Sequence, residues 1–224
     1  MNDYEFHLMQ LADSFFPSGT FGLSGGLESL VKSGRVKNRK DVLQLVRQQL
    51  RFQVLPCDCV ILTIAMEAAR LGDIDKIVEA DNQYYSMKLV RAVRTASTRS
   101  GKQLLHTLAA MKNEPVAKKL QAAIDRGRSA GTYPACLAIA AYSFRIPVAS
   151  AVRMMLYSYC VSIVGSAIRL GVISHIEGQM TLTELAQDAN PRPAKVLSEI
   201  WQLNPLAEIM QMQHEHDEFR MFIT

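Results

Sequence analysis

The sequence predicts an all-α fold: a single domain (residues 1–224) with about ten helices around a long central helix. Three observations support this prediction. Apolar residues recur at helical spacing along most of the 224 residues, and strand-like alternation is absent. The composition, 49% hydrophobic and 21% charged, is that of a globular chain. No Pro/Gly/Ser-rich linker divides the sequence, which favours one domain over two.

Caps and breakers set the predicted helices of the first half. Gly34 and Gly72 are placed as C-terminal stops. Asn38 and Asp41 open a helix that Pro56 is expected to end. Residues 14–20 are interpreted as a loop. The expected helices cover residues 3–13, 23–33, 38–55, 56–71 and 73–112, the last with a break near residue 86.

The second half is predicted from proline positions. Thr132 and Pro134 are a strong start signal, with Thr132 as the cap and Pro134 in the first turn. The helix that follows ends before Pro147, which begins the longest helix. The expected helices cover residues 115–128, 133–146, 147–170, 183–188, 192–203 and a last segment after Pro205.

The longest predicted helix, over residues 147–170, is apolar on two sides. A helix of this kind has to be covered on two sides. Two alternatives stay open: it is the central helix of the domain, or one of its sides meets a partner chain. One stripe consists of Val152, Leu156, Tyr159, Ile163 and Ala167, and the other of Tyr157, Cys160, Val164 and Ile168.

Cysteine usage and hydropathy indicate a reduced, cytoplasmic protein with no membrane span. The N-terminal stretch carries acidic residues and no apolar run, so no signal peptide is expected. The uncharged runs between residues 132 and 168 fall short of the ~20 residues that a membrane span needs. The cysteines match no CxxC pair and lie in apolar surroundings, where thiols act as small hydrophobes: Cys57, Cys59, Cys136 and Cys160.

Signatures of catalysis and of cofactor binding are missing. The segment Ser100-Gly101-Lys102-Gln103 resembles the end of a phosphate loop, but it lacks the upstream glycine and the hydroxyl residue after lysine. His214 and His216 point to opposite sides of a helix, so they could share a metal only in an extended tail. We expect no catalytic residue, no metal site and no cofactor.

Residues 88–128 are strongly basic, with ten Lys/Arg and two acidic residues. On a helix, five of these side chains fall within roughly a 140° arc. A solvated face, a surface for an acidic protein and a nucleic-acid contact are the alternatives. The five residues are Lys88, Arg91, Arg94, Arg99 and Lys102.

A series of short motifs runs in order along nearly the whole chain. They are residues 11–28, Arg94, Ala96, Ser97, Gly101, Gly131, Tyr133, Pro134, residues 156–158, Gly178, Gln179 and residues 212–222. Together these motifs resemble the UreF family of urease accessory proteins. The sequence departs from the family pattern at residues 172–179, and Thr132 replaces a histidine of the family's turn. Arg169 lies where the family tends to carry lysine or arginine.

The resemblance implies a non-enzymatic role in assembly. Proteins of this family form an all-helical homodimer, bind a second accessory protein (UreD, also called UreH) and recruit the GTPase UreG. The complex docks on the urease apoprotein and couples GTP hydrolysis to nickel insertion. No nucleic acid is expected as a partner. Two rival hypotheses are a basic helical nucleic-acid-binding protein and a small metal-dependent hydrolase that uses the His214/His216 tail.

The resemblance also implies particular contact residues. The dimer interface is expected at Arg153 and Tyr157, on the longest helix. A flexible C-terminal tail is expected from about residue 213; it looks too polar to join the core and is implied to order on the UreD-type partner. The residues expected to bind partners are Asp13, Ser14, Pro17, Gly19, Arg94, Arg169, Gln179, His214, Glu215, Arg220 and Phe222.

Overall fold

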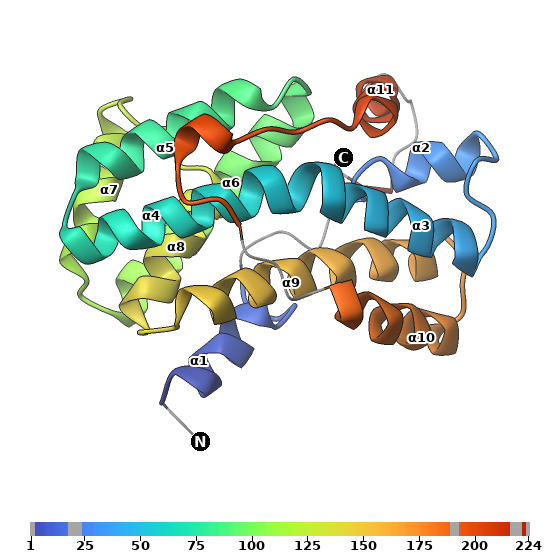
Figure 1. Ribbon diagram of the computed structural model, residues 1–224, viewed down its shortest axis with the longest axis horizontal. Coiled ribbons are helices and arrows are strands. Elements are labelled where there is room, and N and C mark those ends of the chain that lie inside the picture. The colour runs from blue at the N-terminus through green and yellow to red at the C-terminus, as the bar shows by residue number, and fades with distance from the viewer. Residues whose placement is uncertain (1–2, 18–23, 189–192, 216–220, 223–224) are drawn as a thin grey trace.

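The computed structural model describes residues 3–17, 24–188, 193–215 and 221–222, and every regular element in these ranges is helical. The predicted all-α class is therefore confirmed (Figure 1). The α-helices are α1 (Asp3–Ala12), α2 (Leu27–Lys32), α3 (Arg39–Gln49), α4 (Cys59–Leu71), α5 (Ile74–Met87), α6 (Arg91–Met111), α7 (Pro115–Asp125), α8 (Tyr133–Ser143), α9 (Val148–Arg169), α10 (His175–Leu185) and α11 (Pro205–His214).

Two long helical rods organise the bundle. The first consists of α3 and α4, joined by the π-helix η2 (Leu50–Asp58), and the second is α9. The first rod crosses the molecule above α9 (Figure 1). Helices α5 to α8 gather around α4 at one end, while α10 packs against α3 at the other and α11 packs against α2 and α6 (Figure 1). Helix α9 contacts α1, α2, α3, α4, α8 and α10, so the prediction of a central long helix is confirmed.

Pro56 does not end a helix as expected, because the chain passes it as a π-helix. Proline has no backbone N–H, so Pro56 cannot donate a helical hydrogen bond to the carbonyl that lies five residues earlier in a π-helix. Beside it, the Leu203 N–H donates to the Phe52 carbonyl at 2.8 Å, and the Trp201 N–H donates to the Pro56 carbonyl at 3.2 Å. The segment before α11 therefore binds the backbone of the rod next to its proline.

Two other predicted boundaries are wrong. The helix expected at 183–188 begins eight residues earlier, at His175, where Ser174 and Glu177 form a capping box. The helix expected at 192–203 is absent over the described residues 193–203, where the only regular element is the 3₁₀ turn η4 (Leu197–Glu199). This extended segment covers a small apolar cluster that includes Ile61 and Tyr84.

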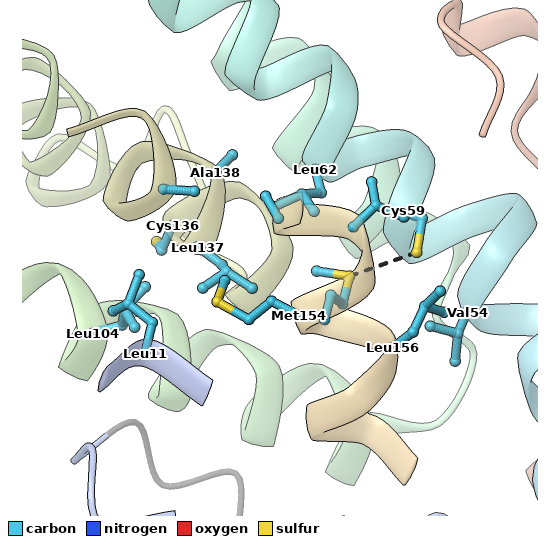
Figure 2. Packing of buried hydrophobic residues seen from close by; sticks show 14 of the residues in the cluster. Leu11, Val54, Cys59, Leu62, Leu104, Cys136, Leu137, Ala138, Met154 and Leu156 are labelled. Atoms are coloured by element: carbon cyan, nitrogen blue, oxygen red, sulfur yellow. Dashed lines mark hydrogen bonds between the residues drawn. The ribbon is translucent and has the colours of Figure 1, made fainter. Parts of the chain in front are cut away.

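The core is built where α4, α6, α8 and α9 meet (Figure 2). Leu62 of α4, Leu104 of α6 and Leu137 of α8 are at most 1% exposed. The dashed contact in Figure 2 is a weak 3.9 Å hydrogen bond from the Cys59 thiol to the Met155 sulfur. All four cysteines are free and buried, which confirms that they pack as small hydrophobes.

A buried carboxylate fixes the start of α8. Asp81 of α5 is fully buried and accepts hydrogen bonds from the backbone N–H groups of Gly131 (2.7 Å) and Thr132 (2.8 Å) and from the hydroxyls of Ser129 and Thr132 (both 2.5 Å). Thr132 occupies the cap position as predicted, but its hydroxyl bonds Asp81 and makes no capping bond. The Ser97 hydroxyl accepts the Tyr133 N–H at 3.1 Å instead.

Gly101 allows α6 to touch the turn before α8. A β-carbon at this position would lie 2.3 Å from the Gly131 carbonyl oxygen and 2.6 Å from the Thr132 carbonyl carbon. Both are backbone atoms, which cannot move aside as a flexible side chain could. The segment that resembles a phosphate loop is thus the middle of a helix, with its glycine used for packing.

Two helical stretches are long and apolar enough to cross a membrane by length and composition alone. They are residues 39–71 and 148–169; 67% and 56% of their most apolar windows are buried inside the protein. The first exceeds the run lengths expected from the sequence because the rod continues through Pro56. Core helices of globular proteins pass the same test, so the finding is weak evidence for a membrane.

We predict that Gly101→Ala lowers the free energy of unfolding by about 2 kcal/mol, since the strain of overpacking against backbone exceeds the gain in helix propensity. Gly165→Ala in α9 is the matched control, because the nearest atom to its added β-carbon is 4.0 Å away. It should raise stability by up to about 1 kcal/mol. Urea unfolding monitored by circular dichroism measures both; equal effects would contradict the close contact.

Candidate functional site

The carboxylate of Glu28 holds the end of the chain. Glu28 lies on α2, is 3% exposed, and accepts the Met221 N–H at 3.1 and 3.2 Å and the Phe222 N–H at 3.2 Å. Lys32 pairs with it from one turn later, at 3.1 Å. A buried carboxylate is costly unless it is hydrogen-bonded, so α2 and residues 221–222 depend on each other.

His214 and Phe222 are buried, contrary to the expectation that the segment from about 213 is too polar to join the core. They are 1% and 6% exposed. The His214 Nε2 lies 3.1 Å from the Phe222 carbonyl oxygen and 3.6 Å from a Glu28 oxygen. The Arg169 guanidinium, at the end of α9, lies 4.8 Å from the centre of the Phe222 ring. These four residues define the tail latch: Glu28, Arg169, His214 and Phe222.

The surroundings of Glu28 and Arg169 shift the pKa values of both side chains. Burial by itself raises the pKa of the Glu28 carboxyl, but hydrogen bonds from Met221, Lys32 and Phe222 outweigh it, so this pKa lies below its ordinary value. Burial lowers the pKa of Arg169. The ionised form of Glu28 is therefore the one that binds the end of the chain.

Glu215 and Arg94 form hydrogen bonds with the backbone at and just before the start of α6. The Ala92 N–H, in the first turn of α6, donates to the Glu215 carboxylate at 2.6 Å. Arg94 donates to the carbonyls of Lys88 (2.5 Å) and Leu89 (2.9 Å). The tail thus contacts the N-terminus of α6, where the helix dipole favours a negative charge.

Lys88 does not belong to the predicted basic stripe, because its side chain is only 2% exposed. Its ammonium lies 3.0 Å from an Asp58 oxygen and 2.8 Å from the Gln202 side-chain oxygen. Tyr84 donates its hydroxyl to the other Asp58 oxygen at 2.8 Å. Lys88 and Asp58 compensate each other inside the protein, and Arg94 bonds backbone carbonyls. Arg91, Arg99 and Lys102 are the exposed residues of the stripe.

The remaining predicted partner residues lie apart from the latch. Asp13, Ser14 and Pro17 are exposed after α1, where Asp13 accepts the Phe15 N–H at 2.8 Å. Gln179 is exposed on α10. Gly19 and Arg220 lie outside the described residues. The structure therefore brings Arg169, His214 and Phe222 together and places the Glu215 carboxylate at the first turn of α6. Glu28, the last residue of the N-terminal motif, joins the latch, whereas Asp13, Ser14 and Pro17 are exposed.

The predicted dimer residues lie on the open side of α9. Arg153 is exposed and Tyr157 is 53% exposed. Together with α1 they line a groove whose apolar members include Leu8, Met9 and Met154. This is the side of α9 that the protein's own core does not cover.

Sequence reasoning missed an apolar surface on α11. Leu206, Ile209 and Met212 are 41%, 50% and 41% exposed, at spacings of three residues along one side of the helix. Leu203 (65%) and Trp201 (46%), in the segment that leads into α11, are exposed as well. We define the α11 surface as these five residues. A scan for helical spacing within 205–214 would have found its stripe, but not that the stripe faces outward.

A cavity of about 120 Å³ lies between η2, α6, α9 and α11, and Tyr84, Ser100 and Tyr159 are among its lining residues. Cys57, beside Asp58, is fully buried, and burial raises the pKa of its thiol to about 12. A thiol of this kind stays protonated and is a poor nucleophile. Among the described residues, no three His, Cys, Asp or Glu side chains are grouped as metal ligands.

The family model and the related proteins that match this chain all point to the same family. A family model described as UreF matches residues 36–186. The urease accessory protein UreF of Trichodesmium erythraeum (strain IMS101) is 29% identical over 219 residues, covering 96% of this chain and 94% of the relative. The proteins of that name from Actinobacillus pleuropneumoniae serotype 5b (strain L20) and Yersinia pestis (strain Pestoides F) are each 28% identical over 221 residues, covering 97% and 96% of both chains, respectively.

We predict that Glu28→Gln releases the end of the chain without unfolding the domain. Loss of the charge weakens the bonds from Met221 and Phe222 by about 1–2 kcal/mol, so their amide exchange should accelerate roughly tenfold or more. Glu67→Gln is the control, because Glu67 forms an exposed pair with Arg70. Unchanged exchange in Glu28→Gln would show that the carboxylate does not hold the tail.

The sign of the pH dependence follows from the lowered pKa of Glu28. A carboxyl whose pKa is depressed by folding contributes stability above its unfolded pKa and loses it as the pH falls through the folded one. Protection of the two amides should therefore persist at neutral pH and fall in acid, below about pH 4.

Proposed function

The chain belongs to the UreF family of urease accessory proteins, and from this premise we propose that it is a cytoplasmic, non-catalytic scaffold for nickel insertion into urease. In this proposal it bridges a UreD/UreH-type partner and a UreG-type GTPase to the urease apoprotein. GTP hydrolysis by the GTPase drives metallocentre assembly, and nickel is the cargo of the complex.

The observation that carries the proposal is the extent of the likeness to proteins named urease accessory protein UreF. It covers nearly the full length of this chain and of its relatives. Long surface insertions or missing segments would change which partners could bind, and the coverage leaves little room for either. A scaffold is defined by its whole surface, so likeness along the whole chain bears directly on function.

The α11 surface supports docking of the UreD-type partner near the C-terminus. Three large apolar side chains are exposed along one side of α11 and two more in the segment before it, and exposed apolar patches often mark interaction sites. The tail latch adjoins this surface through His214, the last residue of α11. A partner on α11 would thus also contact the segment that the family resemblance assigns to partner binding.

The open side of α9 supports the homodimer. Arg153 and Tyr157 are one helical turn apart, and α1 provides the other wall of the groove. In a two-fold dimer the same patch of each copy forms the interface, so Tyr157 contributes to it from both copies. A tyrosine with an apolar body and a polar tip is typical of interface centres.

The chemistry of the described side chains supports a scaffold over an enzyme. The softest potential nickel ligands are the four thiols, and all four are buried. Burial raises the pKa of every one of them, so none is available as a thiolate. This favours a role in which the chain positions other proteins around the metal.

The proposal predicts that purified urease apoprotein, UreD-type protein, UreG-type GTPase, nickel and GTP yield active urease only when this chain is added. Ile209→Asp should abolish activation and weaken UreD-type binding at least about tenfold, because a carboxylate would be buried in an apolar contact. Leu71→Asp is the matched control, since Leu71 is 70% exposed at the end of α4. Full activation without this chain, or without GTP, would refute the scaffold role.

The dimer has its own test. Tyr157→Asp should yield folded monomers, because placing an unpaired carboxylate in the interface costs several kcal/mol. Tyr85→Asp is the control; Tyr85 is 40% exposed on α5, away from the groove. Light scattering gives the mass and circular dichroism the fold. A Tyr157→Asp protein that remains a stable dimer would move the interface elsewhere.

A further inference from the structure

The cavity between η2, α6, α9 and α11 is large enough for a small organic molecule. Its volume is about 120 Å³, whereas a single water needs about 10–15 Å³ and a cavity of about 150 Å³ in another protein holds benzene. None of its described lining residues belongs to the tail latch, the α11 surface or the groove beside Tyr157. The cavity therefore has no part in the surfaces described above.

Much of the cavity wall is apolar. Val54 of η2, Ala96 of α6 and Met155 and Ile163 of α9 line it, and each is at most 5% exposed. Water finds few hydrogen bonds against such a wall, and apolar protein cavities stay dry or take up apolar molecules. This part of the cavity favours the hydrocarbon body of a ligand.

The cavity also presents hydroxyl groups whose hydrogen-bonding capacity is unused. Within the part of the chain that the structure describes, no hydrogen bond involves the side-chain hydroxyls of Ser100, Tyr133 and Tyr159, which all line the cavity. Ser100 is 3% exposed, and burial raises the pKa of Tyr133 to about 12, so its hydroxyl stays protonated. Buried hydroxyls are nearly always hydrogen-bonded. A polar group inside the cavity would satisfy them.

The charges around the cavity favour a neutral ligand. Asp58 is the one charged residue in the described lining, and its carboxylate already binds the Lys88 ammonium at 3.0 Å and the Tyr84 hydroxyl at 2.8 Å. A charged molecule would be buried here without a counter-ion, which is strongly unfavourable.

We propose that this cavity binds a small neutral organic molecule that combines an apolar body with one hydroxyl, and that this hydroxyl pairs with Ser100. A molecule the size of phenol, with about seven non-hydrogen atoms, matches the volume. Its ring would pack against Met155 and Ile163. The site is independent of the scaffold role proposed above, because the surfaces assigned to partners do not line it.

A molecule in this cavity would contact four helical elements at once. Val54, Ala96 and Met155 contribute from η2, α6 and α9, and Gln211, which is 6% exposed, contributes from α11. A ligand that binds only the folded state stabilises that state. Occupancy would therefore hold α11 in place against the rest of the domain.

Phenol and toluene are the probes, because they share one shape and differ by a hydroxyl. Each is titrated into the full-length protein with labelled methionine methyls, and the Met155 signal is followed by NMR. Phenol should bind with a Kd of about 1 mM or below. It should bind at least as tightly as toluene, since hydrogen bonds in the cavity replace those that its hydroxyl loses to water. The methyl of Met111, 43% exposed at the end of α6, should not shift.

Ser100→Ala separates the role of the hydroxyl from that of the apolar wall. This variant should bind phenol about fivefold more weakly and toluene within about twofold of the unaltered protein. Ser143→Ala is the matched control, because Ser143 is also 3% exposed, donates to the Ile139 carbonyl at 2.7 Å and is not among the described lining residues. It should leave the affinity for both probes unchanged.

Ala96→Leu provides a second readout, because the larger side chain fills the cavity from α6 and should abolish binding of both probes. Circular dichroism shows whether each variant is folded. If Ala96→Leu does not fold, the comparison of Ser100→Ala with Ser143→Ala still decides, since each of these removes a single oxygen atom.

Three outcomes would overturn the proposal. Binding of toluene about tenfold or more tighter than phenol would mark a purely apolar cavity, where a hydroxyl finds no partner. Equal weakening of phenol by Ser100→Ala and Ser143→Ala would show that Ser100 does not bind it. If neither probe shifts the Met155 methyl, the cavity does not take up an organic molecule of this size. Each of these results would leave the scaffold proposal untouched.

Discussion

The rest of the structure depends on how the chain satisfies the backbone around Pro56. Pro56 has no backbone N–H, so it removes one helical hydrogen bond from a half-buried stretch of the rod, where an unbonded carbonyl costs about 1–3 kcal/mol. Residues 201–203 lie against η2 and donate hydrogen bonds to the carbonyls of Phe52 and Pro56. Helix α11 begins two residues after Leu203 and packs against α2. The α11 surface and the tail latch therefore follow directly from a segment that is bound to the rod.

Much of the fold was predictable because its signals are local. The stops at Gly34 and Gly72, the cap at Asn38 and the proline starts of α7 and α11 act within one turn, and the sequence shows them directly. The errors have non-local causes. Pro56 was expected to end a helix, because the residues that hydrogen-bond to the backbone beside it lie about 145 positions later and give no local signal. Residues 193–203 lie extended because they bind the rod, against their own helical preference.

The candidate site shows the same division. The exposure of Arg153 and Tyr157 follows from the two-sided pattern of α9, which the sequence contains. The burial of His214 and Phe222 does not, because the carboxylate that attracts them lies on α2, nearly 200 residues earlier. Polarity predicted an unpacked tail, yet the buried Glu28 carboxylate accepts hydrogen bonds from two backbone N–H groups of the tail, and that of Phe222 is buried. Lys88 is a parallel case: its charge suggested a surface, and Asp58 drew it inside.

These contacts connect three surfaces that the sequence presents separately. Through Arg169 the tail latch contacts the end of α9, whose open side carries the predicted dimer residues. Through Glu215 the same segment contacts the first turn of α6, whose outer side carries the exposed Arg91, Arg99 and Lys102. The latch itself begins where the α11 surface ends. A partner that displaced residues 214–222 would therefore remove a ring contact from α9 and a negative charge from the N-terminus of α6 in one step. By linkage, whatever stabilises the latch must oppose that displacement by the same free energy.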